Sequence, residues 1–116
     1  MFKEQIKNEL ERGSKISIIN VVNYLIEGAH ALRASDIHID PQQDDVQVRF
    51  RIDGVLQDAH VLPKRIHPEV ISRIKIISNL RTDEHQAAQD GRFRTVLQDG
   101  IVVDVRVSVA PTFHGE

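Results

Sequence analysis

The residues of this sequence that are best suited to a chemical role are four arginines that fall inside strand-like patterns. Arg49 and Arg51 alternate with apolar residues in one such pattern, Arg92 opens a second, and Arg106 lies in the middle of a third. A guanidinium on a rigid strand presents a fixed fork of N–H donors, which suits a phosphate or a carboxylate. The chemistry that these positions could supply is therefore the binding of an anion.

Two of these arginines also have a simpler interpretation as halves of surface ion pairs. Arg106 stands two residues after Asp104, and Arg51 stands two residues before Asp53, so each shares a strand face with an acidic neighbour. Exposed ion pairs of this kind typically contribute less than about 1 kcal/mol to stability. From the spacing alone, the ion pairs are the favoured interpretation.

The sequence lacks the motifs of a nucleotide-hydrolysing site. Its six glycines never form the Gly-x-x-x-x-Gly-Lys-Ser/Thr or Gly-x-Gly-x-x-Gly loops whose backbone N–H groups hold phosphates. His38 and Asp40 share a strand face and could hold a metal, but a polar strand face is the commoner role for such a pair. We therefore expect no cofactor and no catalysis from this chain by itself.

The composition fits one small domain. The 116 residues are 41% hydrophobic and 28% charged and include no cysteine, so a core is expected and a disulfide framework is excluded. The net charge of −2 and the 4% of aromatic residues do not favour a nucleic-acid partner. No signal-peptide block or uninterrupted apolar span occurs, so we expect a cytoplasmic protein.

The spacing of the apolar residues predicts three helices that could pack against the strands. Residues 2–12 form a short, highly charged helix. From Ser17, a good N-cap, to about Arg33, apolar residues recur at helical spacing; they are Ile18, Val22, Leu25, Ala29 and Leu32. We expect this stripe to pack on a sheet. The helix after Pro63 has a predicted buried face made of Val70, Ile71, Ile74, Ile77 and Leu80.

A period of two predicts five strands, which are residues 36–40, 46–52, 55–62, 93–97 and 101–109. The turn signals at Asp53-Gly54 and at 98–100 join the last four into two hairpins. Residues 81–90 are polar and without period, which predicts a loop. This order predicts an α+β fold, with two helices on one face of a mostly antiparallel sheet.

Six short strings in residues 17–116 carry a resemblance to a known family. They are ASDIHIDP at 34–41, VRFRIDG at 48–54, SRIK at 72–75, QDGR at 89–92, DVRVS at 104–108 and PTxxGE at 111–116. In order and spacing they closely resemble the domain that precedes the P-loop domain in the ATPases of type II secretion and type IV pilus assembly. Such a set of linked strings is hard to produce by chance.

The resemblance implies a PAS-like second amino-terminal domain at 17–116, preceded by a linker or N-terminal helix at 1–16. In the family this domain is joined to a RecA-like motor domain, which binds ATP with Mg²⁺, and six subunits form a homohexameric ring. The ring lies in the cytoplasm, at the inner-membrane platform of the secretion or pilus machinery. The resemblance therefore implies that the full-length parent hydrolyses ATP, although this chain has no Walker A motif.

The resemblance also assigns roles to the arginines. Arg106 matches an arginine that reaches the γ-phosphate of ATP, and its usual companion would stand in a strand that follows Glu116. Arg92 is a weaker candidate for the same contact. Arg49 and Arg51, by contrast, are expected to serve the structure of the first hairpin.

Two alternatives and one departure remain open. The chain could be a free-standing PAS-like sensor that holds a small ligand between helix and sheet, although its closely spaced valines and isoleucines suggest a filled core. It could also be a ring-assembly module without nucleotide contact. Residues 83–88 depart from the family's usual acidic-basic-basic run ending in proline, which leaves the conformation of this loop, and its part in subunit contacts, undetermined.

Overall fold

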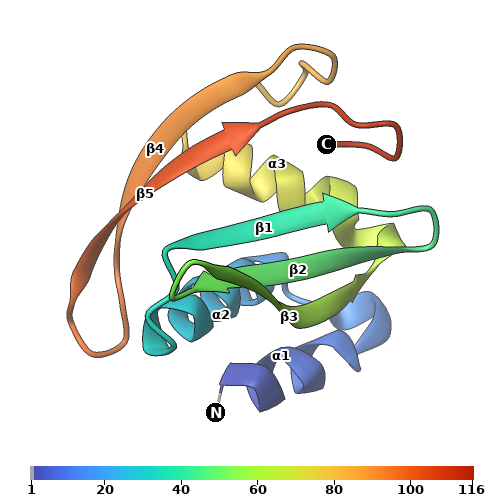
Figure 1. Cartoon of the computed structure of the whole chain (residues 1–116). Helices are drawn as coiled ribbons and strands as arrows, with labels where there is room; N and C mark the ends of the chain where they lie inside the picture. Colours follow the sequence, from blue (N-terminus) through green and yellow to red (C-terminus); the bar gives the residue numbers. More distant parts are fainter. Residues whose placement is uncertain (1) are drawn as a thin grey trace.

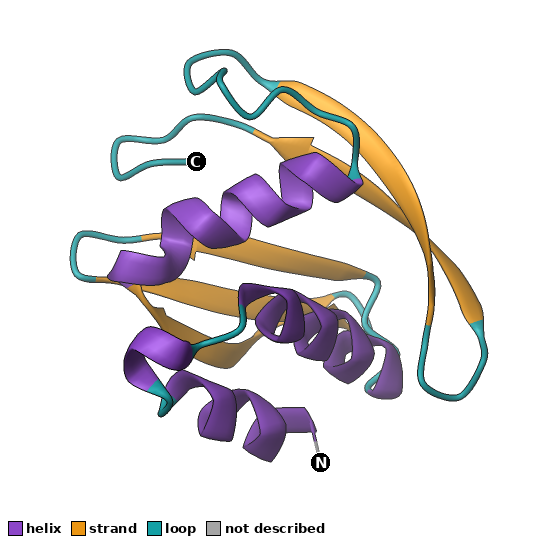
Figure 2. Ribbon diagram, turned by 180° about the vertical axis from the view of Figure 1, so that it is seen from behind, coloured by secondary structure: helices purple, strands orange, loops and turns teal. Residues whose placement is uncertain are grey.

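Helices lie on one side of a three-stranded sheet in the computed structural model, which describes residues 2–116 (Figures 1 and 2). The elements are α1 Phe2–Leu10, α2 Ile18–Ala31, β1 Asp36–Pro41, β2 Asp45–Ile52, β3 Val55–Pro63, α3 His67–Ile77, β4 Gln89–Val96 and β5 Val102–Val109. The predicted α+β class is confirmed. No helix within the described residues is both long and apolar enough to cross a membrane.

The first sheet has the strand order β1-β2-β3, and both pairs are antiparallel. Alternate residues of β2 point into the core, and Val46, Val48 and Phe50 are all buried, as the period of two predicts. The turn between β2 and β3 has positive φ at both Asp53 (51°) and Gly54 (81°). Two left-handed residues in succession are what a two-residue type I′ hairpin requires, so this turn signal was correct.

The core lies between this sheet and the helices and is built from all of them. Val22, Leu25 and Ala29 of the predicted α2 stripe are buried, but Leu32 is 56% exposed. The reason is that α2 ends at Ala31 and the chain turns at once through Arg33, whose φ is 57°. α2 also packs against α1 and α3, not only against the sheet. The buried part of the α2 surface is therefore wider than the single apolar stripe that the sequence predicted.

The second hairpin is a separate two-stranded sheet, which differs from the single sheet expected from the sequence. β4 pairs only with β5 among the described strands, and the hairpin arches away from β1–β3 (Figure 1). The preceding loop ends at Ala88, so β4 starts four residues earlier than predicted. At its tip Leu97 is buried, and the backbone N–H of Gln98 donates to Glu27 Oε1 of α2 at 2.7 Å.

α1 packs closely on the rest of the domain. Ile6 is fully buried in the core, and a Cβ on Gly28 of α2 would lie 3.4 Å from Phe2 Cβ, so α2 presents its glycine where α1 approaches. The carboxylate of Glu9 is buried at the start of α2. It accepts hydrogen bonds from the Ser17 backbone N–H (3.0 Å), Asn20 Nδ2 (3.1 Å) and Arg12 (3.1 Å).

We expect Glu9→Gln to lower the free energy of unfolding by about 1–3 kcal/mol at neutral pH, because an amide leaves buried donors unsatisfied. The N–H of Ser17 is the main cause that lowers the pKa of Glu9, and the side chains of Asn20 and Arg12 add to it. A carboxyl whose pKa is lowered on folding stabilises above its ordinary pKa and loses that contribution as pH falls.

Urea unfolding of both proteins between pH 3 and 7 measures this effect. The difference between Glu9→Gln and the wild type should shrink as pH falls below the ordinary value of 4.5. Glu11→Gln is the control, because Glu11 is exposed and its carboxylate is not among the partners of this network. A constant difference at all pH values would show that the charge of Glu9 is not what stabilises the contact.

Candidate anion-binding face of the second hairpin

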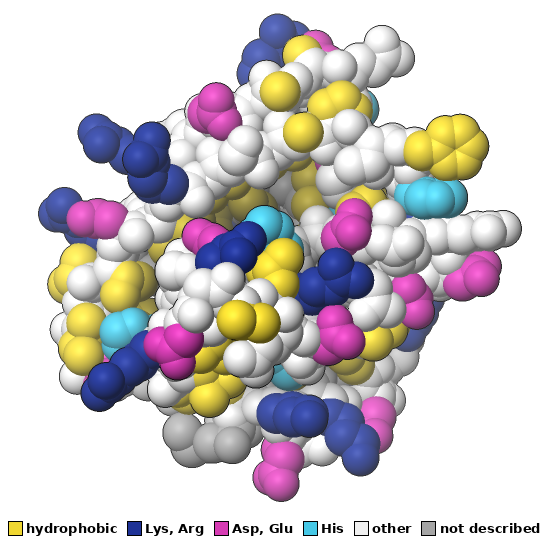
Figure 3. Space-filling model, in the orientation of Figure 1, with side chains coloured by type: hydrophobic (Ala, Val, Ile, Leu, Met, Phe, Trp, Pro, Cys, Tyr) yellow, Lys and Arg dark blue, Asp and Glu magenta, His cyan; other side chains and the backbone are white. Residues whose placement is uncertain are grey.

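Arg92 and Arg106 are directly opposite each other across the β4–β5 ladder. Both are exposed, since even-numbered residues of the two strands point outward while the odd-numbered ones are partly buried. Lys and Arg side chains gather along the outer curve of this hairpin, at the upper left of Figure 3. The two arginines singled out from the sequence are thus brought together on one face.

Asp104 pairs with Arg94, not with Arg106 as the simpler interpretation expected. Arg94 Nε lies 2.8 Å from Asp104 Oδ1, and these two residues are also cross-strand partners. The hydrogen bond and charge of Arg94 lower the pKa of Asp104, and the charge of Arg92 adds to this. Within residues 2–116, no carboxylate forms an ion pair with Arg92 or Arg106.

Two like charges directly opposite on a sheet have Cβ atoms about 5 Å apart and destabilise the pair of strands. Arg92 and Arg106 are in this arrangement, with the neutralised pair of Arg94 and Asp104 beside them. A bound anion would remove the repulsion, since two guanidinium groups can donate to the oxygens of one phosphate. The outer face of the hairpin is therefore the candidate anion site.

The arginines of the first hairpin have structural partners, as the sequence indicated. Arg51 Nε donates to Asp36 Oδ2 at 2.8 Å and its guanidinium also donates to the Gly54 carbonyl at 3.2 Å. The expected pair of Arg51 with Asp53 is wrong, because Asp53 occupies the left-handed turn. Arg49 Nε donates to Asp58 Oδ1 at 3.2 Å across the strands.

His38 lies on the exposed part of β1, with its Nε2 3.8 Å from Asp36 Oδ2. The carboxylate of Asp40 instead accepts from Gln42 Nε2 at 2.9 Å. In the described part of the chain, no three side chains of histidine, aspartate or glutamate converge as metal ligands would.

Two residues of the QDGR string position the start of β4 and with it Arg92. The side chain of Gln89 bonds the backbone of Arg81 twice, with Oε1 accepting from its N–H (2.9 Å) and Nε2 donating to its carbonyl (3.0 Å). Gly91 crosses the end of α3 so closely that a Cβ would lie 2.8 Å from the Ser78 carbonyl oxygen. The glycine is needed for this approach, because only a residue without Cβ fits.

We expect Gly91→Ala to destabilise the domain by about 1–3 kcal/mol, since the new methyl group meets a backbone oxygen that cannot rotate away. Gly28→Ala is the matched control. Its Cβ would make an ordinary 3.4 Å contact within a helix, where alanine is favoured over glycine by up to about 1 kcal/mol. Urea unfolding compares the two variants. Equal stabilities would show that β4 can shift away from α3 without cost.

The structure reveals one polar cluster that the sequence reasoning missed. Lys75, on the buried side of α3, is only 1% exposed, and its Nζ lies 2.8 Å from Glu116 Oε1 and 2.7 Å from Oε2. The geometry of a hydrogen bond is met at Oε1, and the contact with Oε2 is ionic. The sequence did indicate that Lys75 is buried, because it follows the buried Ile71 by four residues and therefore lies on the same face of α3.

The same cluster includes two histidines. His85 Nδ1 lies 2.8 Å from Glu116 Oε1, and His67 Nε2 lies 2.6 Å from the Glu116 carbonyl oxygen. Burial raises the pKa of Glu116, but the hydrogen bonds and charges of His85 and Lys75 outweigh it and lower the pKa overall. Burial lowers the pKa of His67, so we expect its imidazole to be neutral at pH 7.

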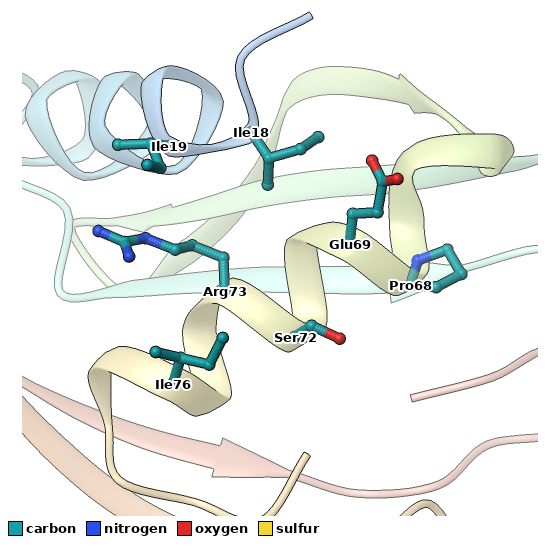
Figure 4. Close-up of a pocket in the computed structure, with 7 residues that line it drawn as sticks. All are labelled: Ile18, Ile19, Pro68, Glu69, Ser72, Arg73 and Ile76. Atoms are coloured by element: carbon teal, nitrogen blue, oxygen red, sulfur yellow. The ribbon is translucent and has the colours of Figure 1, made fainter. Parts of the chain in front are cut away.

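Two hollows lie at the surface of the described chain. One, of about 330 Å³, is an open apolar groove where Ile18 and Ile19 of α2 face Arg73 and Ile76 of α3 (Figure 4). The other, of about 200 Å³, lies between α2 and the tip of the β4–β5 hairpin. Neither is enclosed between the helices and the sheet, where a small-ligand sensor would need its cavity.

Known proteins resemble this chain over nearly its whole length. A family profile described as "Type II/IV secretion system protein" matches residues 11–116. The chain is 46% identical over 103 residues to "Type II secretion system protein E" of Xanthomonas campestris, covering 89% of this chain and 18% of that protein. It is 37% identical over 113 residues to "Type IV pilus assembly ATPase PilB" of Myxococcus xanthus, covering 97% and 20%.

A third relative, "Type IV pilus assembly ATPase PilB" of Thermus thermophilus, is 47% identical over 95 residues, covering 82% of this chain and 11% of that protein. The chain therefore spans about a fifth or less of the length of these three relatives. Since the family profile covers all but the first ten residues, the chain belongs to the type II/IV secretion system protein family.

Proposed function

We propose that this chain is a regulatory and assembly domain of a hexameric ATPase that powers type II protein secretion or type IV pilus assembly. In this role Arg106 contacts ATP held by the motor domain of the full-length protein. The observation that carries the proposal is the exposed pair of Arg92 and Arg106, which face each other without a carboxylate while their neighbour Arg94 has one. The names of the similar proteins, two of which are pilus assembly ATPases, support the activity.

The two guanidinium groups would act on the charge of the transferred phosphoryl group. In phosphoryl transfer, negative charge is spread over the equatorial oxygens of the γ-phosphate, and a positioned arginine lowers the barrier by stabilising it. Arg106, in the middle of β5, donates to these oxygens, and Arg92 adds a second cation from the opposite strand. Mg²⁺ and the hydrolytic residues belong to the motor domain in this proposal.

The fold supports the remaining parts of the proposal. A three-stranded antiparallel sheet with helices on one side agrees with a PAS-like domain at 17–116. The opposite, exposed surface and the hairpin leave room to pack on the motor domain and on neighbouring subunits of a homohexamer. The assembly would be cytoplasmic and peripheral at the inner membrane, through the secretion or pilus platform.

Two experiments test this function. Arg106→Ala in the full-length protein should abolish most ATP hydrolysis, and turnover equal to the wild type would contradict the role of Arg106. The isolated chain should show no micromolar binding of ATP by calorimetry, because it contains no glycine-rich phosphate loop. Tight binding by the isolated chain would instead favour an independent nucleotide site.

A further inference from the structure

The β4–β5 hairpin is held on the domain mainly at its two ends. At its tip, Gln98 bonds Glu27 of α2. At its base, the chain arrives through residues 81–88 and leaves through 110–116, and the sides of the hairpin make few contacts with the other elements. The direction in which its outer face points therefore depends on the tip contact and on whatever fixes these two segments at the base.

One side chain fixes both of them. Lys75 Nζ donates to the Glu84 carbonyl oxygen at 2.7 Å in the incoming segment and to Glu116 Oε1 at 2.8 Å in the outgoing one. His85, also in the incoming segment, bonds the same Glu116 carboxylate. Two of the family strings, SRIK at 72–75 and PTxxGE at 111–116, thus meet in a single buried contact.

A second lysine strengthens the outgoing segment. Lys64 Nζ donates to the His114 carbonyl oxygen at 2.7 Å and to the Gln42 carbonyl oxygen. With His67 on the Glu116 carbonyl, residues 110–116 are attached to the region 64–75 at three points. The Lys75 contact is the only one of these that also reaches residues 81–88.

The energetics of the ion pair between Lys75 and Glu116 indicate that it holds the two segments in position and does not act through stability alone. Lys75 is 1% exposed and the Glu116 side chain 9%, so both ions have lost most of their water. Replacing a buried ion pair by apolar residues of similar size is often neutral or stabilising. An apolar residue at position 75 would bury equally well, but it could not bind a carbonyl in one segment and a carboxylate in the other.

We propose that Lys75 and Glu116 are positioning residues for Arg106, and that their contact holds the hairpin at the angle at which its arginines meet ATP. The proposal rests on the function proposed above. Lys75 and Glu116 act by fixing the incoming and outgoing segments at the base of the hairpin on α3, and not by contacting the arginines. Loss of the contact should therefore lower the rate of hydrolysis more than the affinity for ATP.

The key variant is the double substitution Lys75→Met, Glu116→Leu. Lys75→Met alone leaves a buried carboxylate without its cation and is expected to destabilise the fold. The double variant removes both charges, so it should retain the stability of the wild type. Because it still lacks the polar contact, residues 84–88 and 112–116 should exchange their amide hydrogens at least about tenfold faster, while β1–β3 stay protected.

Hydrogen exchange on this chain and ATP hydrolysis by the full-length double variant together decide the matter. We expect kcat to fall about 10- to 100-fold, as displacement of a catalytic group by about 1 Å can cause, with KM for ATP nearly unchanged. Adding Arg106→Ala to the double variant should give the same rate as Arg106→Ala alone.

Unchanged exchange in the two segments would overturn the positioning role, and so would wild-type kcat in the double variant when Arg106→Ala is inactive. Failure of the proposed function has a different signature. In that case Arg106→Ala itself would hydrolyse ATP at the wild-type rate, while the two segments still exchange faster in the double variant.

Discussion

Full-length protein with Arg106→Ala is expected to hydrolyse ATP about 100- to 1,000-fold more slowly than the wild type, the usual cost of removing a cation or donor from a developing oxyanion. Most of the loss should appear in kcat. In the proposed role, the guanidinium of Arg106 would interact more strongly with the charge of the transition state than with bound ATP. Steady-state kinetics at saturating Mg²⁺ and ATP measure the effect.

The same substitution should leave the domain as stable as before, or slightly more stable. Arg92 and Arg106 are cross-strand partners of like charge. Removing their repulsion should raise the free energy of unfolding by roughly 0.2–1 kcal/mol, the usual size of a cross-strand pair effect. Urea unfolding of the isolated chain with and without Arg106→Ala tests this. A loss of turnover together with unchanged or higher stability separates a role in catalysis from a role in folding.

Arg94→Ala is the matched control for Arg106→Ala. It removes an arginine from the same outer face, but one that is already paired with Asp104 at 2.8 Å. Its turnover should stay within a few-fold of the wild type, and the unfolding free energy should change little, because exposed pairs contribute at most about 1 kcal/mol. Equal losses in the two variants would indicate a general effect of charge on this face, not a specific contact by Arg106.

The largest expected effect on stability is that of Phe50→Ala, which should lower the free energy of unfolding by about 3–5 kcal/mol. Phe50 is 2% exposed on the central strand β2, and its ring and that of His60 are packed edge to face with their centroids 5.9 Å apart. Alanine would leave a cavity in the core beneath β2. Domains of this size are stable by about 5–15 kcal/mol, so a large share would be lost.

Val61→Ala is the control for this prediction, since Val61 lies on the neighbouring strand β3 but is 54% exposed. A surface change of this kind should alter stability by no more than about 0.5 kcal/mol. Urea unfolding at pH 7 compares both variants with the wild type. A loss below 1 kcal/mol for Phe50→Ala would show that the core repacks around the missing ring.

Local patterns in the sequence determined the helices, the strands and both hairpin turns. Alternation in 46–52 predicted the buried face of β2, the Asp53-Gly54 pair predicted a turn that the structure shows, and Ser17 is the N-cap, accepting from the Asn20 N–H at 3.3 Å. These features depend on residues within a few positions of one another. That is why they could be predicted without the tertiary structure.

The position of the second hairpin could not be predicted in the same way. Both of its strands were predicted, although β4 starts four residues earlier than expected. Their separation from β1–β3 depends on the close crossing of Gly91 over Ser78 and on the contact of the tip with α2. Neither contact produces a repeating pattern of apolar and polar residues in the sequence. The pairing of Arg94 with Asp104 was missed for the same reason, because it depends on register across two strands.

The sequence indicated Arg92 and Arg106 as candidate anion ligands, but it could not show that the two face each other across the β4–β5 ladder, with neither in an ion pair among residues 2–116. It identified residue types, strand faces and a family. The tertiary structure alone decided the cross-strand partners and the buried contact of Lys75 with Glu116, 41 residues apart. The physical reason is that charge pairs form wherever folding brings groups within hydrogen-bond distance, and no local propensity encodes that distance.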